Sequence, residues 1–266
     1  MNIKKMILLL ASPLLLAACD RDRIPNICED TPQYCVNLHE DSWCKFERTA
    51  LIRARKENGI NQSDANAYQL INKLTSYHDC LSPLLDIEYK RRKERKTDKV
   101  DAVYYAQEAL QDLAVKTKDS DYPYLLLWHW QHEGNYGAKS RFLKLADRPE
   151  MQEPELQNAL GELLMLRDQP RAERAFHRAL SLYKKDQEIN TDIIANILTI
   201  FINQQNYEQA WIWTRVLSKL DYKENIDTER MDAYAKFNET ERQEMQNKAN
   251  DIVSKLAKGT YQVPLK

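Results

Sequence analysis

The chain has 266 residues, of which 43% are hydrophobic and 30% charged, so it is long enough and apolar enough to fold around a core. Its formal net charge of −1 gives no reason to expect a nucleic-acid partner. Only 5 residues are glycine, about 2% where about 7% is usual. This scarcity argues against strand-rich folds and against glycine-rich phosphate-binding loops, and it predicts an all-α fold with short connections.

The first 18 residues have the features of a targeting sequence. Lys4 and Lys5 precede an apolar run over residues 6–18, which is too short to span a bilayer. The run ends in Leu-Ala-Ala-Cys at 16–19, which resembles the lipobox of bacterial lipoproteins, where small residues precede a cysteine that is lipidated. We therefore predict cleavage before Cys19 and anchoring through its lipid. An ordinary secretory signal is the alternative.

Asp20 follows the predicted lipidation site. An aspartate here resembles the signal that retains enterobacterial lipoproteins in the inner membrane, although Arg21 departs from the strongest form of that signal. The sequence thus predicts a periplasm-facing protein of the bacterial envelope, with the inner membrane favoured over the outer membrane. Residues 19–41 are expected to form a tether and a disulfide-bearing segment.

Two antiparallel helices are predicted between residues 42 and 81. The first covers residues 42–57 and is ended by Asn58-Gly59, and Ser63 is the expected N-cap of the second. Apolar side chains recur at helical spacing in both. The two stripes are Trp43, Phe46, Ala50, Leu51 and Ala54, and then Ala67, Leu70, Ile71, Leu74, Tyr77 and Leu81.

The hairpin geometry selects a pairing for the four cysteines that remain, an even number typical of disulfides in exported chains. At about 1.5 Å per residue, Cys44 lies about 20 Å from the turn and Cys80 about 24 Å. These levels match within side-chain reach, so we predict that Cys44 pairs with Cys80 and Cys28 with Cys35. A zinc site is the alternative, but the spacings contain no Cys-x-x-Cys pair, and we expect no metal.

The largest charge cluster is the basic run at residues 90–96. Its cations are Lys90, Arg91, Arg92, Lys93, Arg95 and Lys96. In an anchored protein, these side chains are candidates for contact with anionic lipid headgroups, which attract basic residues near the membrane surface. A solvated loop or helix end is the alternative interpretation.

Three segments within about residues 100–220 align when the second is shifted by 34 residues and the third by a further 38. The aligned sets are Leu126, Leu160 and Leu198; Trp130, Leu164 and Ile202; Ala138, Ala172 and Ala210; Phe142, Phe176 and Thr214; and Leu145, Ala179 and Leu217. Gly134, Asp168 and Asn206 fall at the turn between the two helices of each segment. Upstream, Ala102, Ala106 and Ala109 have the spacing of another second helix.

This pattern resembles the tetratricopeptide repeat, a pair of helices with a period of 34 residues. The resemblance implies helical hairpins stacked as a solenoid, in which the small alanine lets helices approach and the aromatic fills the gap to the next repeat. Thr214 departs from the pattern because it stands where the other two segments carry phenylalanine.

Residues 227–258 are predicted to form capping helices at the end of this array. One apolar stripe runs along an otherwise polar helix, and it consists of Met245, Ala249, Ile252, Val253 and Leu256. A polar terminal helix closes the exposed end of a solenoid. The elements together predict a single all-α domain over residues 42–266.

Candidate catalytic chemistry is limited to two histidines. His129 and His132 lie one turn apart on a predicted helix beside Glu133, but a metal needs three or four ligands. His129 also aligns with the apolar Leu163 and Phe201, which favours a packed, hydrogen-bonded histidine. Because the chain has no known nucleophile or phosphate-binding motif, we expect no catalytic residue, no cofactor and no enzyme.

A polar stripe marks the candidate binding groove. Asp192, Asn196, Thr199 and Asn203 follow one another along a helix of apolar residues, and Asn158 occupies the place equivalent to Asn196. In tetratricopeptide arrays the first helices line the concave groove, where asparagines can hydrogen-bond a peptide backbone. Trp211 lies off the apolar face of its helix and is expected to be an exposed aromatic contact. A solvated stripe on a half-buried helix is the alternative.

These features favour a non-catalytic, lipid-anchored scaffold that binds a peptide or partner protein in a helical-repeat groove. The alternatives are an envelope enzyme or regulatory subunit in cell-wall metabolism, and a structural lipoprotein that contacts the membrane surface. The lipobox, the four cysteines and the degenerate repeats also resemble an uncharacterised domain-of-unknown-function family of gammaproteobacterial lipoproteins, a resemblance that implies no activity. The residues specify neither the partner nor the oligomeric state.

Overall fold

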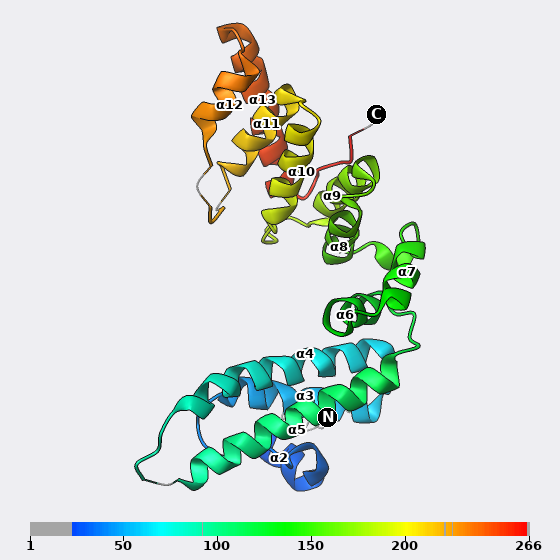
Figure 1. The fold of residues 1–266 in the computed structure, drawn as a ribbon, viewed down its shortest axis with the longest axis vertical. Coiled ribbons are helices and arrows are strands. Elements are labelled where there is room, and N and C mark those ends of the chain that lie inside the picture. Colours follow the sequence, from blue (N-terminus) through cyan, green and yellow to red (C-terminus); the bar gives the residue numbers. More distant parts are fainter. Residues whose placement is uncertain (1–22, 92, 221, 225, 265–266) are drawn as a thin grey trace, which may run out of the picture. The chain divides into compact units, whose positions relative to one another are not determined.

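The computed structural model describes residues 23–91, 93–220, 222–224 and 226–264 (Figure 1). Every regular element in these ranges is a helix, which confirms the all-α prediction. The sequence predicts one body over residues 42–266, and the described residues gather into two compact units, the first ending at Gly134 and the second beginning at Asn135. None of the described helices has the length and apolar character needed to cross a bilayer.

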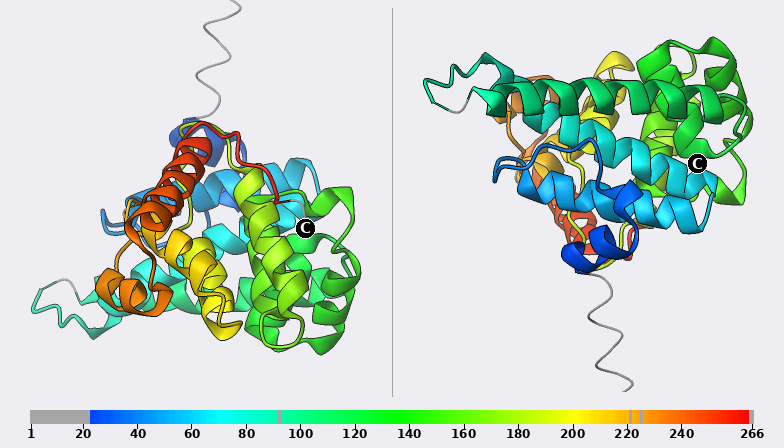
Figure 2. Two further views of the ribbon diagram at one scale, coloured as in Figure 1. Left: turned by 90° about the horizontal axis from the view of Figure 1, so that it is seen from above. Right: turned by 90° about the horizontal axis from the view of Figure 1, so that it is seen from below.

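The first unit is a helical hairpin with a third long helix packed on it. Its helices are α2 (Ile24–Asp30), α3 (Lys45–Ile60), α4 (Asp64–Leu81), α5 (Glu94–Thr117) and α6 (Pro123–Glu133), with 3₁₀ segments at Pro32–Tyr34 and Ser82–Asp86. The right-hand view of Figure 2 shows α3, α4 and α5 side by side. Ser63 caps α4 as predicted, because its hydroxyl accepts a hydrogen bond from the backbone N–H of Asn66.

The predicted stripe of α4 forms the centre of the core of the first unit. Tyr77 and Ile71 are fully buried, and α5 adds Ala102 and Ala106, whose small side chains let it approach α4 closely. Leu125 and Trp128 of α6 belong to the same core. The core of this unit is therefore built around α4.

The stripe predicted for the first helix is wrong at its beginning. The helix starts at Lys45 rather than at residue 42, and it buries Leu51, Ile52 and Arg55. Trp43 precedes the helix and is 51% exposed, while Phe46 lies on its outer side and is 84% exposed. The prediction included Trp43 because it assumed an earlier helix start, and it included Phe46 because it placed the buried face on the side of Ala50 and Ala54, whereas the helix buries Leu51, Ile52 and Arg55.

The end of this helix also differs from the prediction. It continues through Asn58-Gly59 to Ile60. A Cβ atom at position 59 would overlap the phenol ring of Tyr34, so this glycine permits a close contact inside a helix and does not end it.

The second unit contains two packed helical hairpins and two terminal helices. Its elements are α7 (Tyr136–Lys144), a 3₁₀ segment (Pro149–Met151), α8 (Pro154–Leu164), α9 (Gln169–Leu182), α10 (Asp192–Asn203), α11 (Tyr207–Leu217), α12 (Thr228–Ala235) and α13 (Glu239–Ala257). Helix α8 packs on α9, α9 on α10, and α10 on α11, while α12 and α13 both pack on α11. The predicted first repeat divides between the units, because α6 belongs to the first and α7 to the second.

The aligned residues have equivalent places in the second and third segments, where Asp168 and Asn206 each cap the following helix through a side-chain oxygen. In the first segment the cap is Asn135, one residue after the aligned Gly134, which ends α6 in a left-handed conformation. Three residues or more into those helices, the predicted small and aromatic positions are buried. They are Ala138, Ala172, Ala210, Phe142, Phe176 and Thr214. In the first helix of the third segment, however, Ile202 is 40% exposed, which the repeat pattern did not predict.

Candidate functional site

Both predicted disulfides are present, Cys28–Cys35 and Cys44–Cys80. The second joins the residue before α3 to the last turn of α4, with the Cα atoms 5.9 Å apart. Cys44, Glu47 and Cys80 form the one cluster of possible metal ligands found in the described ranges, and both of its sulfur atoms are in the disulfide. The cysteines are therefore structural cross-links. Cys19, Asp20 and Arg92 lie outside the described residues.

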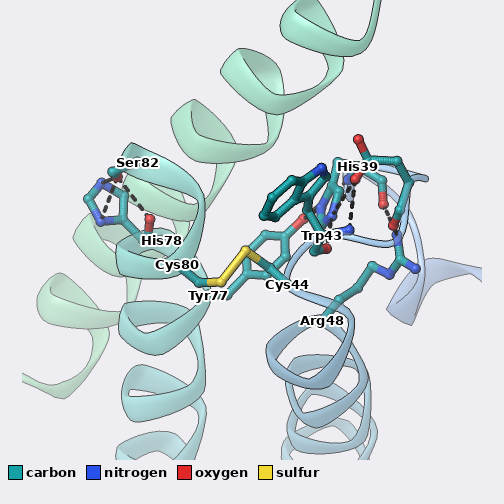
Figure 3. The surroundings of a disulfide bond; sticks show 9 residues. His39, Trp43, Cys44, Arg48, Tyr77, His78, Cys80 and Ser82 are labelled. Carbon is teal, nitrogen blue, oxygen red and sulfur yellow. Dashed lines mark hydrogen bonds and ion pairs between the residues drawn. A yellow bond between two sulfur atoms is a disulfide. The ribbon is translucent and has the colours of Figure 1, made fainter. Parts of the chain in front are cut away.

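A buried histidine lies beside the disulfide that joins α3 and α4 (Figure 3). His39 Nε2 is 2.5 Å from the carbonyl oxygen of Trp43, so Nε2 carries the proton and donates it. The neutral ring then accepts from the Tyr77 hydroxyl at Nδ1, over 2.7 Å. The same hydroxyl accepts from the backbone N–H of His39 at 3.1 Å. These bonds fix the segment before α3 on the buried face of α4.

An ion pair ties that segment to α5. Lys99 is only 1% exposed, and its ammonium group is hydrogen-bonded to the Asp41 carboxylate. Burial raises the pKa of Asp41, but the hydrogen bonds from Lys99 and from the Trp43 backbone outweigh it and leave the pKa below its ordinary value. Lys99 also lies 5.2 Å from the ring centre of Tyr89. The pair fixes the start of α5 to the residues before α3.

The buried histidine should make the stability of the first unit depend on pH. Burial lowers the pKa of His39 below its ordinary 6.5, and the charges of Arg48 and Lys99 lower it further against the opposing effects of the Trp43 carbonyl and Asp41. The unfolded chain then binds more protons than the folded chain, so the free energy of unfolding rises with pH in this window. This contribution is complete above pH 6.5 and is lost as the pH falls through the lowered pKa.

The measurement is urea unfolding at pH 7.5 and pH 5.5. We expect His39→Gln to reduce the difference in unfolding free energy between the two pH values. His78→Gln, which changes a partly exposed histidine of the same unit, is the matched control. An unchanged pH difference in His39→Gln would assign the dependence to other groups.

The two histidines that the sequence analysis considered, His129 and His132, have structural roles. His129 is buried, and its Nε2 lies 3.0 Å from the hydroxyl of Thr117, which agrees with the packed, hydrogen-bonded role predicted for it. His132 Nδ1 lies 3.1 Å from the carbonyl oxygen of Trp128, and its ring stacks on the Trp128 indole. Each imidazole ring therefore contacts polar or aromatic groups of its own unit.

The basic run lies in the connection between α4 and α5 and in the first turn of α5. Lys90, Arg91, Lys93 and Lys96 are exposed, and Arg95 is partly buried. These side chains are therefore available to an external partner.

The predicted groove stripe on α10 is largely exposed. Asp192, Thr199 and Asn203 are exposed and Asn196 is half-buried. On α8, Asn158 is less available to a partner. Its side-chain N–H donates to Glu162 at 2.9 Å, and its side-chain oxygen Oδ1 is buried without a hydrogen-bond partner in the described part of the chain. Of the two helices, α10 thus presents more of its predicted polar side chains.

An apolar pocket opens beside this stripe. It has a volume of about 400 Å³, and its lining comes from α10, α11 and α12 together with the residues before α12. Its lining includes Leu198, Ile202, Tyr207, Thr214, Met231 and Tyr234. Ile202 lies three residues after Thr199 on α10, so their side chains are neighbours on the helix surface and the pocket flanks this part of the polar stripe.

The position of Thr214 gives this pocket a physical cause. In the second segment the equivalent Phe176 is fully buried, and its ring packs so tightly on α8 that a Cβ atom at Gly161 would overlap it. Phe142 is fully buried in the first segment. The smaller Thr214 lines the pocket, so the sequence departure at this position coincides with the hollow. That departure was the available sequence signal for the pocket.

Trp211 is not the exposed aromatic that the sequence predicted. It is 1% exposed because α12 and α13 pack on α11. Its indole N–H donates to Asp232 at 2.5 Å, and Arg215 bonds the same carboxylate at 2.8 Å. Burial raises the pKa of Asp232, but these hydrogen bonds outweigh it and leave the pKa lowered. Trp211 therefore holds the terminal helices in place.

A second cavity in this unit is lined by the chain's own C-terminal segment. It has a volume of about 750 Å³ and lies among α9, α11, α13 and residues 260–264. Tyr261 is buried there, with its hydroxyl 2.7 Å from His177 Nδ1 and its ring edge-on to Trp213. Burial raises the pKa of Tyr261, and the charge of Glu173 raises it further. No sequence pattern indicated that this segment folds back on α9.

Comparison with known proteins identifies one family. A family model described as "Protein of unknown function (DUF2989)" matches residues 16–215. No curated protein and no solved structure shows significant similarity to the chain.

Proposed function

The chain belongs to the DUF2989 family of proteins of unknown function, and we propose that this member is a non-catalytic, lipid-anchored interaction scaffold of the bacterial envelope. Its helical-repeat unit would bind an extended segment of a partner protein along α10. The observation that carries the proposal is the apolar pocket beside Thr214, because it adjoins the exposed polar stripe.

The arrangement on α10 suits an extended peptide. Amide and hydroxyl side chains, such as those of Asn196 and Thr199, can hydrogen-bond a peptide backbone, and the pocket can take one apolar side chain of the same peptide. Leu198, Ile202 and Tyr234 supply apolar contact area. An apolar anchor with a few placed polar groups is the usual composition of a recognition site.

The tetratricopeptide-like arrangement is part of the same proposal. It is supported by the capped second helices and by the complete burial of Ala172 and Ala210, which bring paired helices close together. The C-terminal segment offers an internal example of the binding mode, because residues 260–264 are non-helical and are held against α9 through Tyr261. The same unit thus already holds one non-helical segment through an aromatic anchor.

The proposed location rests on the lipobox and the cysteines. Leu-Ala-Ala-Cys at 16–19 supports lipidation of Cys19, and Asp20 supports the inner membrane. Two disulfides are typical of oxidising compartments such as the periplasm. The chain would therefore face the periplasm on a lipid tether.

Lipid anchoring is tested by Cys19→Ala. We expect this variant to lose acylation and to remain unprocessed or to appear as a soluble exported protein, since the acylated residue is absent. The measurements are metabolic labelling with a fatty acid and fractionation of cell envelopes. Ser42→Ala, at an exposed site in the first unit, is the control. A Cys19→Ala protein of mature size that stays in the membrane would overturn the assignment.

Peptide binding is tested by filling the pocket. Extended 12-residue peptides would be selected from a displayed library against the purified chain, and their affinity measured by fluorescence anisotropy. Thr214→Phe restores the aromatic found in the other two segments, so we expect a stable fold but an affinity at least about tenfold weaker, because one buried apolar side chain contributes about 1.5–3 kcal/mol. Asn196→Ala should weaken the same peptides by about 2- to 10-fold.

Thr240→Phe is the matched control, since it adds the same ring at an exposed position of α13. Thermal melting on the same preparations separates loss of binding from loss of fold. Selected peptides that bind Thr214→Phe as tightly as the unchanged chain would place the binding surface elsewhere, and a failure to select any peptide would contradict the scaffold proposal.

A further inference from the structure

Three helix ends meet at one end of the first unit. The Cys44–Cys80 disulfide places the start of α3 beside the end of α4, and the Asp41–Lys99 ion pair brings the start of α5 to the same place. Figure 1 shows the connection between α4 and α5 extending from this end. The residues before α3 and the basic run are thus neighbours in the folded unit.

Two large aromatic side chains are exposed here. Trp43 is 51% exposed and Phe46 is 84% exposed, on the two sides of Cys44 in the sequence. Ile87, in the connection after α4, is 39% exposed. Exposed apolar side chains that gather with a rim of charges mark a surface that contacts another phase or partner.

The aromatic pair stands on a rigid base. The backbone of Trp43 accepts a hydrogen bond from His39 and donates one to Asp41, and the adjacent Cys44 is cross-linked to α4 (Figure 3). The two rings are therefore presented to the outside by residues that are themselves fixed, so little ordering is needed when they bind.

The connection between α4 and α5, which begins at the same end of the unit, carries net positive charge. Residues 86–96 contain six basic and three acidic side chains, a net charge of +3. Lys90, Arg91, Lys93 and Lys96 are exposed, and Lys45, next to Phe46, is exposed as well. A surface with this composition complements negative charge.

We infer that this end of the first unit, defined by Trp43, Phe46 and Ile87 with the exposed Lys90, Arg91, Lys93 and Lys96, docks on an anionic lipid bilayer. Tryptophan prefers the headgroup region of membranes, and basic side chains are attracted to anionic headgroups. The inference concerns the first unit, so it is independent of the peptide site proposed on α10.

The test uses the mature chain, residues 19–266 with Cys19→Ser, so that neither a lipid nor the apolar run at residues 6–18 contributes and the protein surface alone determines binding. Co-sedimentation would be measured with vesicles of phosphatidylcholine and with vesicles of phosphatidylcholine and phosphatidylglycerol at 3:1. We expect binding to the anionic vesicles that falls as salt rises, because exposed charges are screened. Trp43→Ser with Phe46→Ser should lower the partition coefficient at least about tenfold, and Lys90→Gln with Arg91→Gln and Lys93→Gln should lower it by a similar factor.

Matched controls come from the second unit. Tyr136→Ser with Leu166→Ser removes side chains that are 76% and 96% exposed, and Lys184→Gln with Lys185→Gln removes two exposed charges. These variants should bind vesicles as the Cys19→Ser chain does. Equal binding by the Trp43 and Phe46 variants, or no binding of the Cys19→Ser chain to anionic vesicles, would overturn the inference.

A photoreactive residue at position 46 of the anchored protein in cells separates a bilayer from a protein partner. We expect crosslinks to phospholipid. Crosslinks to a protein in place of lipid would overturn the inference in favour of a protein interface at this end of the unit.

Discussion

Ala172→Arg should unfold the second unit. The Ala172 side chain is fully buried in α9, which packs on both α8 and α10, so a long charged side chain has no space and no access to water. Overpacking and burial of an unpaired charge together cost more than about 4 kcal/mol, a large fraction of the stability of an ordinary domain. The measurement is urea unfolding followed by circular dichroism, with hydrogen exchange to locate the lost protection.

The control for this substitution is Ala257→Arg. It adds the same side chain at an exposed position at the end of α13 and should change the unfolding free energy by less than about 0.5 kcal/mol. An Ala172→Arg chain that retained the melting temperature of the unchanged chain would contradict the close packing of α9 on α8 and α10.

Asp41→Asn should destabilise the first unit by about 3–5 kcal/mol. The substitution keeps the shape of the side chain but removes the only carboxylate in an ion pair with Lys99 among the described residues, and Lys99 is 1% exposed. Its ammonium would keep a long 3.4 Å hydrogen bond to the Arg95 carbonyl and a position over the Tyr89 ring, which compensate a buried charge poorly. Urea unfolding at pH 7.5 measures the loss.

A double variant separates the ion pair from the shape of the site. Asp41→Asn with Lys99→Met removes both charges and should recover most of the stability, because no unpaired charge remains buried. Asp79→Asn, whose carboxylate is 68% exposed, is the matched control and should be nearly neutral. A double variant as unstable as Asp41→Asn would mean that the carboxylate acts through its other contacts.

Local sequence determined the helices and their ends in most of the chain. Side-chain caps at Ser63, Asp168 and Asn206 are satisfied by N–H groups within three residues, so they can be read without knowing the fold. The Cys44–Cys80 pairing was also predictable, because a short turn between two helices leaves one antiparallel arrangement and a fixed rise per residue. The burial of Ala172 and Ala210 was predictable as well, because both occupy the position of the repeat at which a small residue lets two helices approach.

The candidate site was only partly predictable. The polar stripe on α10 was evident from helical periodicity, and Thr214 was recognised as a departure from the repeat, but the pocket also needs Met231 and Tyr234 from α12. Those residues lie more than a dozen positions further along the chain, and nothing in their own pattern says which helix they will face. The pocket forms only when α10, α11 and α12 pack together, so no single helix pattern predicts it.

Only the tertiary structure decided which faces of the helices are covered. Trp211 was expected outside, yet α12 and α13 pack on α11 and bury it against Asp232, whereas Trp43 and Phe46 were expected inside and lie exposed. The Asp41–Lys99 pair and the Tyr261–His177 bond join residues 58 and 84 positions apart, and no local spacing encodes them. Periodicity reports that a helix has an apolar side, since it depends on residues three and four apart, but the burial of a given side chain depends on the elements that pack on it.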